Sequence, residues 1–320
     1  MINGIPTAEL IVEAHKRIEP FVHRTPVLTS QSLNDLTGAE LFFKCENMQR
    51  GGAFKARGAF NASLSLKPEE RANGIATHSS GNHATALSLA GKTLGVPAFV
   101  VMPSNSKKIK VASVNAFGGK ITFCEPNLKA REDTLAQVIS STGASFIPPY
   151  DDYRIICGQA TSAKELIEDV PGLQAIIAPV GGGGLLSGTA LSSRYFGNSI
   201  TVFAAEPAGA DDAWRSMREG AIIPSVNPNT IADGLLTSLG TRNFPIIREF
   251  VKEIITVDDS DIVSAMRLIW ERLKIIVEPS SATVLAAVIK APHSFAGKKT
   301  GLIISGGNVD LSETALWFNS

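Results

Sequence analysis

The feature that most constrains this chain is a regular alternation of short apolar segments with longer amphipathic ones. Helical patterns such as 83–95 and 260–273 lie between the short segments, and Gly and Pro mark the joins. Strands that alternate with helices of this length are typical of βαβ units. The strand candidates are ELFFKC (40–45), GIATHS (74–79), PAFVVM (97–102), KITFCE (120–125), QAIIAPV (174–180), ITVFAAE (200–206) and TGLIIS (300–305). Near-continuous apolar strands fit parallel sheets covered on both faces, so the sequence predicts an α/β fold with mainly parallel, open twisted sheets flanked by helices.

The length of 320 residues indicates about two domains. PPYDD (148–152) has the character of a crossing segment, and it follows a block of strand and helix units. We therefore predict a smaller, substrate-gating domain formed by residues 74–151. It would be inserted into a larger, cofactor-binding domain formed by residues 1–73 and 152–320.

The charge balance excludes several classes of partner. Thirty basic and thirty acidic residues give a formal net charge of zero, whereas nucleic-acid and membrane-surface binding need a basic excess. The first twenty residues contain acids and no long apolar run, so we expect neither a signal peptide nor a membrane span. Cys45, Cys124 and Cys157 are too few and too far apart for a disulfide framework or a metal site, so we expect a cytoplasmic protein.

The run APVGGGGLLSG (178–188) predicts an anion site. A strand leads into Gly181, Gly182, Gly183 and Gly184, and a helix follows. Residues without Cβ let several backbone amides converge on one anion, and the helix N-terminus adds its dipole. A flexible turn is the plain alternative, but four successive glycines are entropically costly without a use.

A nicotinamide dinucleotide is the rival ligand for this loop. Gly182, Gly184 and Ser187 approximate the G-x-G-x-x-G/A fingerprint, and Glu206 ends the next strand at the distance of a ribose-binding acid. An NAD-dependent dehydrogenase therefore remains open on local pattern. However, this sequence lacks the third glycine of the fingerprint, and the dehydrogenase hypothesis leaves the segment GGAFKARGA (51–59) unexplained.

In GGAFKARGA, Lys55 stands among small and apolar residues, and a second cation, Arg57, follows. A solvated helix lysine is the plain interpretation. A sequestered lysine together with a phosphate site favours pyridoxal 5′-phosphate, which needs a lysine for its Schiff base and a partner for its pyridine nitrogen. Ser305, at the end of the last strand candidate, is placed to be that partner.

The motifs together resemble the fold-type II pyridoxal-phosphate enzymes, which are tryptophan synthase β-like, and in particular the serine racemase and serine/threonine dehydratase group. The resemblance runs nearly end to end. Its motifs are TPVLTSQSLN (25–34), FFKCENMQRGGAFKARGA (42–59), SSGNHA (79–84), GQATSAKEL (158–166), PVGGGGLLSG (179–188), EPAGADD (206–212), TIADGL (230–235), VEPSSA (277–282) and SGGNVDL (305–311).

The resemblance implies a role for each part of the cofactor site. Lys55 is expected to form the Schiff base, and Phe54 to pack beside the cofactor ring. Asn82 is expected at the ring hydroxyl, the four loop glycines at the phosphate, and Ser305 at the pyridine nitrogen. A lysine near a cationic or apolar wall has a lowered pKa, which leaves its amine available for these steps.

The resemblance also implies that Ser79, Ser80, Asn82 and His83 form the loop that binds the substrate carboxylate. Ser80 is expected to face the cofactor opposite Lys55. Inverting a stereocentre requires a proton donor on each face, so this pair is sufficient for racemisation. A simple carboxylate-loop hydroxyl is the alternative role. We expect a serine racemase that also eliminates water from L-serine and L-threonine, giving a 2-oxo acid and ammonia.

The preferred amino-acid substrate stays open. Ala84 departs from the glycine of animal serine racemases, so a threo-3-hydroxyaspartate dehydratase or a catabolic threonine dehydratase without racemisation remains possible. Arg131 would pair with an acidic substrate, and Thr237 would lie on a facing loop. A surface arginine is the plain interpretation. A pyridoxal-phosphate-binding protein without catalysis is the alternative from another class.

EPAGADD (206–212) predicts a divalent cation site. Glu206 and Asp212 supply carboxylates, the Ala210 carbonyl lies between them, and waters would complete an octahedron around Mg²⁺, Ca²⁺ or Mn²⁺. The plain alternative is an acidic helix start. The resemblance favours the cation, and it also implies a homodimer and allows ATP as an activator.

Overall fold

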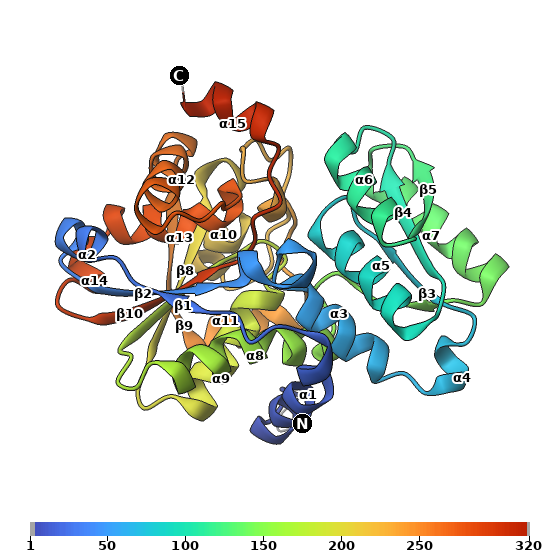
Figure 1. Ribbon diagram of the computed structural model, residues 1–320, viewed down its shortest axis with the longest axis horizontal. Coiled ribbons are helices and arrows are strands. Elements are labelled where there is room, and N and C mark those ends of the chain that lie inside the picture. The colour runs from blue at the N-terminus through green and yellow to red at the C-terminus, as the bar shows by residue number, and fades with distance from the viewer. Residues whose placement is uncertain (1–3, 319–320) are drawn as a thin grey trace.

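The computed structural model describes residues 4–318 and contains two sheets (Figure 1). Neighbouring strands are parallel throughout, except that β1 runs antiparallel to β2. The six-stranded sheet has the order β1 (Val27–Leu28), β2 (Glu40–Cys45), β10 (Lys299–Ile304), β7 (Ala175–Pro179), β8 (Thr201–Pro207), β9 (Val251–Val257). The four-stranded sheet has the order β5 (Lys120–Cys124), β4 (Ala98–Pro103), β3 (Ile75–His78), β6 (Ser145–Phe146).

All seven strand candidates of the sequence are strands, within one or two residues at each end. The three strands that the sequence pattern missed are at sheet edges. The β1 and β6 strands have two residues each, which is too short for a periodic signal. The β9 strand is longer, but it is an edge strand with Lys252 and Glu253 exposed, so its apolar pattern is interrupted.

The helices connect these strands. Before β6 they are α1 (Ala8–Ile18), α2 (Gln31–Thr37), α3 (Lys55–Leu64), α4 (Pro68–Arg71), α5 (Asn82–Leu94), α6 (Lys108–Ala116) and α7 (Leu128–Thr142). After β6 they are α8 (Tyr153–Asp169), α9 (Gly184–Phe196), α10 (Asp212–Glu219), α11 (Asn243–Phe250), α12 (Asp259–Leu273), α13 (Pro279–Lys290), α14 (Pro292–Phe295) and α15 (Leu311–Phe318). In the described part of the chain, no helix has the length and apolar character that crossing a membrane would require.

Side chains alternate between the two faces of the six-stranded sheet and build a core on each. In β7, Ala175 and Ile177 pack in the cluster that includes α12 and α13. Ile176 and Ala178 pack on the other side, in the cluster that includes α8 and α9. Figure 1 shows these two helical layers above and below the sheet. The period of two along a strand therefore explains why its sequence is apolar at every position.

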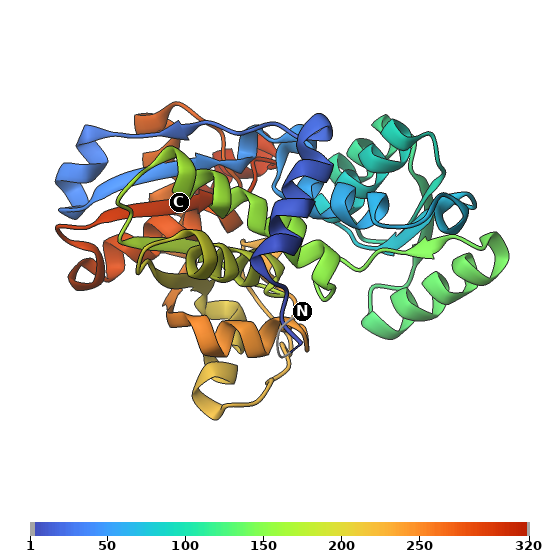
Figure 2. The same cartoon turned by 90° about the horizontal axis from the view of Figure 1, so that it is seen from below.

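The four-stranded sheet is covered in the same way. In β4, Val100 packs with residues of α5 and α6, whereas Val101 packs with α7. Figure 2 shows the two sheets side by side. All four strands of the smaller sheet lie within residues 75–146, but α3 packs into the same core cluster as α5, through Ala56 and Phe60. The exact division into two domains at residues 74 and 151 remains a prediction.

The carboxyl ends of the strands gather the segments that the sequence singled out. The glycine loop follows β7, Ser305 follows β10, and the loop 79–81 follows β3. In open parallel sheets, ligands bind at the carboxyl ends of the strands. The fold therefore brings together segments that are far apart in the chain, as the hydrogen bond between Asn308 and the Gly51 carbonyl, 257 residues apart, illustrates.

Candidate active site

Lys55 begins α3, and the residues before it are fixed against the end of β10. The Phe54 amide donates to the Ser305 carbonyl at 2.9 Å, and Ala53 forms an isolated antiparallel bridge with Gly306. The Ser305 hydroxyl is buried and lies 2.9 Å from the Ser281 hydroxyl. The structure thus places the segment of Lys55 beside Ser305, as the resemblance implies.

The ammonium group of Lys55 is surrounded by protein, although the side chain as a whole is only half-buried. Its Nζ donates to the Pro149 carbonyl at 2.9 Å and lies 5.1 Å from the centroid of the Phe54 ring. Burial lowers the pKa of Lys55 to about 8, and the charge of Glu278 opposes that shift. An apolar wall, not a cationic one, therefore makes the amine available near neutral pH.

The four loop glycines form a buried set of amide donors. In residues 4–318, the amides of Gly181, Gly182, Gly183 and Gly184 make no backbone hydrogen bond, and all four residues are buried. The loop leads directly into the N-terminus of α9. Buried amides without a partner are rare in proteins, and a phosphate at this helix N-terminus would satisfy them. The loop therefore fits the cofactor phosphate.

Tyr150 gives the loop glycines a second, steric reason to lack side chains. A Cβ on Gly182 would lie 2.4 Å from Tyr150 Cγ, and a Cβ on Gly184 would lie 3.2 Å from Tyr150 Cβ. Burial raises the pKa of Tyr150, while a hydrogen bond with the Thr237 hydroxyl lowers it. Sequence analysis missed this residue. Its only signal was an aromatic residue in the crossing segment 148–152.

Asn82 begins α5, and both ends of its amide are held. Its Nδ2 donates to the two carboxylate oxygens of Glu278 at 2.8 and 3.1 Å. Its Oδ1 accepts from Asn308 Nδ2 at 3.0 Å. Burial raises the pKa of Glu278 to about 7. These contacts fix the orientation of the amide. Glu278 was missed as a site residue, although an acid within the motif VEPSSA was a usable signal.

The loop expected to bind the substrate carboxylate precedes and begins α5. The Ser79 hydroxyl accepts from the Gly81 amide at 3.3 Å. Ser80 is half-buried, and its hydroxyl makes no hydrogen bond within the described part of the chain. The His83 ring points into the protein, with Nε2 3.2 Å from the Ile147 carbonyl. Burial, with the charge of Lys55, lowers the pKa of His83 to about 3, so the ring is neutral. Any contact of His83 with a carboxylate would therefore come from its backbone amide in the first turn of the helix.

Arg131 and Thr237 lie near Tyr150. Arg131 is a half-buried residue of α7, and its positive charge contributes to lowering the pKa of both His78 and Tyr150. No ion pair of Arg131 is present among residues 4–318. Thr237 is exposed. Tyr150 thus lies within electrostatic reach of Arg131 and within hydrogen-bond reach of Thr237.

The acidic cluster lies where β8 ends and α10 begins. The carboxylate of Glu206 accepts from the amides of Ala213 and Trp214, each at 2.8 Å. Asp212 is fully buried, and neither of its carboxylate oxygens has a hydrogen bond of good geometry among the described residues. Burial raises the pKa of Glu206 to about 8 and that of Asp212 to about 6. Weaker contacts of Asp212 with the Leu239 backbone and the Ser225 hydroxyl, and the charge of Arg215, oppose the rise in its pKa.

A divalent cation would supply a countercharge in direct contact with these two carboxylates, whereas the nearby Arg215 is paired with Asp211. The buried Ala210 lies in the turn between Glu206 and Asp212. Residues 4–318 contain no group of three or more His, Cys, Asp or Glu side chains arranged for a metal. The predicted site has only two carboxylates, with a carbonyl and waters as further ligands, which is a donor set that Mg²⁺ and Ca²⁺ accept.

Comparison with known proteins gives the family. The sequence profile of the family described as "Pyridoxal-phosphate dependent enzyme" matches residues 18–306. The β-hydroxyaspartate dehydratase of Paracoccus denitrificans is 52% identical over 309 residues, which cover 97% of this chain and 98% of that protein. The serine racemase of Dictyostelium discoideum is 50% identical over 317 residues, covering 98% of each. The structure of maize serine racemase superposes with a TM-score of 0.94 at 45% identity, covering 98% of this chain and 96% of that one.

These findings decide between the two ligands that the glycine loop left open. Both oxygens of Glu206 accept backbone hydrogen bonds in a buried position, so this acid is not presented to a ribose. The buried loop amides, the desolvated Lys55 and the family match all agree with pyridoxal phosphate. The chain therefore belongs to the family of pyridoxal-phosphate-dependent enzymes, with the fold-type II architecture of its serine racemase and dehydratase relatives.

Proposed function

We propose that this protein is a serine racemase that also catalyses β-elimination from L-serine and L-threonine. The observation that carries the proposal is the desolvated amine of Lys55, which is held by the residue before Tyr150, the ring that packs on the glycine loop. Relatives with about half of their residues identical include a serine racemase. Pyridoxal 5′-phosphate, when bound, supplies the electron sink that makes the α-proton of an amino acid acidic.

Three groups of this chain would hold and orient the non-covalently bound parts of the cofactor. The loop glycine amides would bind its phosphate, and the fixed Asn82 amide would face its ring hydroxyl. Ser305, held by Ser281, would lie at the pyridine nitrogen. A hydroxyl is uncharged and cannot keep that nitrogen protonated as a carboxylate would. We infer that the site favours rapid reprotonation or rapid loss of a β-substituent.

Two side chains would move the proton at Cα. Lys55, with its pKa lowered to about 8, would take the proton of the L-enantiomer as a general base. Ser80 would return a proton on the opposite face. If the β-hydroxyl leaves before that proton arrives, the product is a 2-oxo acid and ammonia. Racemisation and elimination therefore compete for the same deprotonated substrate.

One incubation distinguishes the outcomes. The holoenzyme is mixed with L-serine in D₂O, and D-serine, pyruvate and deuterium at Cα are measured together. We expect D-serine that carries deuterium, accompanied by pyruvate. Pyruvate without any D-serine would make the protein a dehydratase, and neither product with any amino acid tested would leave a cofactor-binding protein without this catalysis. The Lys55→Ala variant is the blank.

A 3-hydroxyaspartate dehydratase is the second candidate, and the unpaired charge of Arg131 favours it. This guanidinium has no carboxylate partner among the described residues and acts on Tyr150, which itself contacts the glycine loop. A substrate with a second carboxylate would supply that partner. One relative, 52% identical, is a β-hydroxyaspartate dehydratase.

The Arg131→Gln variant tests this candidate. A lost charge-assisted hydrogen bond is worth about 1.5–3 kcal/mol, or roughly 10- to 150-fold. If the candidate is right, kcat/KM for threo-3-hydroxyaspartate falls by that factor, while kcat/KM for L-serine changes little. Equal losses for the two substrates would contradict it. Arg154→Gln, which removes a cation paired with Asp152, is the matched control.

The remaining predictions concern ligands and assembly. We propose Mg²⁺, or Ca²⁺ or Mn²⁺, at Glu206, Asp212 and the Ala210 carbonyl, where it would support the large sheet without taking part in chemistry. A homodimer, activation by ATP and a cytoplasmic location also remain predictions from the sequence, as does the absence of nucleic-acid and membrane partners.

A further inference from the structure

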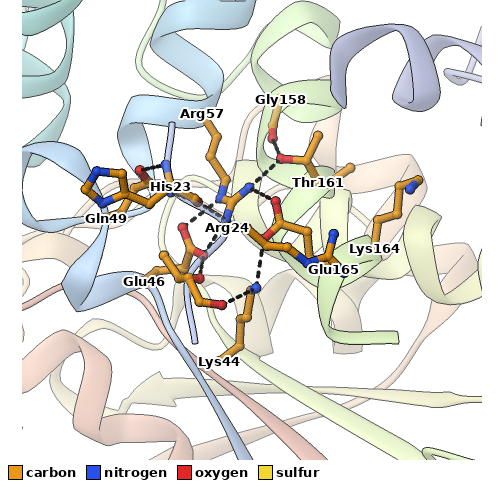
Figure 3. A network of polar contacts seen from close by, with 12 residues as sticks. His23, Arg24, Lys44, Glu46, Gln49, Arg57, Gly158, Thr161, Lys164 and Glu165 are labelled. Carbon is orange, nitrogen blue, oxygen red and sulfur yellow. Dashed lines mark hydrogen bonds and ion pairs between the residues drawn. The ribbon is translucent and has the colours of Figure 1, made fainter. Parts of the chain in front are cut away.

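A buried ionic network lies directly behind the first turn of α3 (Figure 3). Arg57 Nε and Nη2 donate to the carboxylate of Glu46, each at 2.8 Å. Its Nη1 and Nη2 donate to the carboxylate of Glu165 at 2.7 and 2.8 Å. Lys44 Nζ lies 2.7 Å from Glu165 Oε2. We call these four residues, Lys44, Glu46, Arg57 and Glu165, the Arg57 network.

The network joins three separate parts of the large sheet and its helical layer. Lys44 belongs to β2 and Glu46 follows it, Glu165 belongs to α8, and Arg57 belongs to α3. Further acceptors surround the guanidinium, namely the Thr161 hydroxyl at 3.1 Å and the His23 carbonyl at 3.2 Å. Every N–H of Arg57 therefore donates a hydrogen bond. Because the guanidinium is planar and rigid, these bonds restrain the position of α3.

The four residues of the Arg57 network balance in charge, and at its edge Lys44 also lies 3.8 Å from the carboxylate of Asp169. Its two cations and two anions sum to zero, and their side chains are between 0% and 3% exposed. Burial lowers the pKa of the Lys55 amine, and the charge of Glu278 opposes that shift. The guanidinium of Arg57, two residues along the chain, is paired with two carboxylates.

Arg57 and Lys55 leave the helix in nearly opposite directions. Two residues of an α-helix are separated by about 200° around its axis. Arg57 accordingly reaches toward β2 and α8, while Lys55 reaches toward Pro149 and the candidate active site. The contacts of Arg57 on one side of α3 therefore fix the backbone position from which the Lys55 side chain extends on the other side.

A buried ion pair is weak evidence for stability, because packed apolar side chains can often replace it with no loss. The geometry of this network, which joins three elements around one rigid guanidinium, favours a role in fixing position. We infer that Arg57 is a positioning residue that fixes the first turn of α3, and with it the Lys55 amine, relative to the glycine loop and Ser305. This inference rests on the proposed role of Lys55 and adds a residue that does not touch cofactor or substrate.

The test compares the full-length protein with its Arg57→Lys variant, which keeps the charge and removes the fork. The cofactor is stripped and added back, and the visible band of lysine-bound pyridoxal phosphate is followed in time as a function of pH. Because misplacement by about 1 Å can cost about a hundredfold in rate, we expect attachment and kcat to slow by about tenfold or more. We expect KM and the pH midpoint of attachment to stay unchanged.

The control is Ile269→Ala, a fully buried site on α12 in the other core layer, far from α3 in the chain. Both variants are studied at the same temperature interval below their melting points. Slowing in Arg57→Lys but not in Ile269→Ala supports positioning. Equal rates in Arg57→Lys and the parent protein, or equal slowing in both variants, would overturn it.

A milder change covers the case in which Arg57→Lys does not fold. Thr161→Val removes one uncharged acceptor of Arg57 and leaves the charges balanced. Slower attachment is again expected, by a smaller factor, and an unchanged rate would overturn the inference. Failure of the proposed role of Lys55 is recognised separately, because Lys55→Ala would then still bind the cofactor covalently. Failure of the proposed reaction is recognised by the assay of D-serine and pyruvate on the parent protein.

Discussion

The Nζ of Lys55 donates a hydrogen bond to the carbonyl oxygen of Pro149 at 2.9 Å. This bond connects the start of α3 with the segment that leads from the smaller sheet back to the large one. The next residue, Tyr150, packs on the glycine loop. The candidate base and the candidate phosphate loop are therefore held by two consecutive residues of one connecting segment.

Replacing Lys55 by Ala should abolish both the visible band of bound cofactor and all turnover. No other lysine is expected to replace it, because attachment requires an amine that is neutral near pH 8. Absorbance spectra and a pyruvate assay measure the two effects. Lys92→Ala, which changes a lysine of α5 whose Nζ contacts the Ala116 carbonyl, is the matched control and should behave like the parent protein. A covalent band that survives in Lys55→Ala would assign the anchor to a different lysine.

Cofactor attachment should depend on pH with a midpoint near 8. The reactive form is the neutral amine, whose fraction rises with pH, so the attachment rate should increase through the lowered pKa of Lys55. The negative charge of Glu278 favours the ammonium form and raises that pKa, so Glu278→Gln should move the midpoint to lower pH. Stopped-flow absorbance on the stripped protein gives both curves. A midpoint in Glu278→Gln that moves upward would contradict the electrostatic assignment.

Ser80→Ala should separate the two reactions. Racemisation of L-serine should be lost, because the donor on the second face is gone, while Lys55 can still remove the proton of the L-enantiomer and elimination should persist at least in part. Chiral chromatography and pyruvate release are measured on the same sample. Ser79→Ala, whose hydroxyl accepts a bond from Gly81, provides the comparison. Racemisation at the parental rate in Ser80→Ala would mean that water or a different side chain supplies the second proton.

Gly182→Ala should weaken cofactor binding through a steric conflict. The added Cβ would lie 2.4 Å from Tyr150 Cγ, so either the ring or the loop must move. We expect the affinity for pyridoxal phosphate to fall by about tenfold or more, as measured by titration of the visible band. Adding Tyr150→Ala should restore part of this affinity, because it removes the obstructing ring. If the double variant binds no better than Gly182→Ala, the loop amides themselves, rather than Tyr150, set the constraint.

Thorough chelation should lower both the melting temperature and activity, and Mg²⁺, Mn²⁺ or Ca²⁺ should restore them. Without a cation, Glu206 and Asp212 remain buried with no positive charge in direct contact among the described residues, which is unfavourable for their ionised forms. Glu206→Ala should mimic chelation while Lys55 still binds the cofactor. Asp211→Asn is the control, because Asp211 is a partly exposed carboxylate paired with Arg215. If the chelated protein keeps full activity and its melting point, and Glu206→Ala responds normally to ions, no cation binds here. The acidic cluster would then serve only as the start of a helix.

Much of the fold was predictable because its signals are local. Buried parallel strands are apolar at every position, so β2, β7, β8 and β10 were each recognisable from a few adjacent residues. The glycine run and the small and apolar residues around Lys55 are also local signals, and they were enough to predict a phosphate site and a lysine that binds the cofactor covalently. Strand β9 escaped because its edge position leaves charged side chains in the pattern.

The sequence by itself determined the fold class, the glycine loop, Lys55 and, through its motifs, the family. Only the tertiary structure decided what surrounds them. The contact of Tyr150 with Gly182, that of Glu278 with Asn82, and the hydrogen bond that orients His83 join residues 32 to 196 positions apart in the chain. Likewise, the sequence shows Arg57 only as a second cation near Lys55, and only the fold shows its ion pairs with Glu46 and Glu165. Hydrogen bonds and desolvation depend on distance in space, and a linear pattern records only distance along the chain.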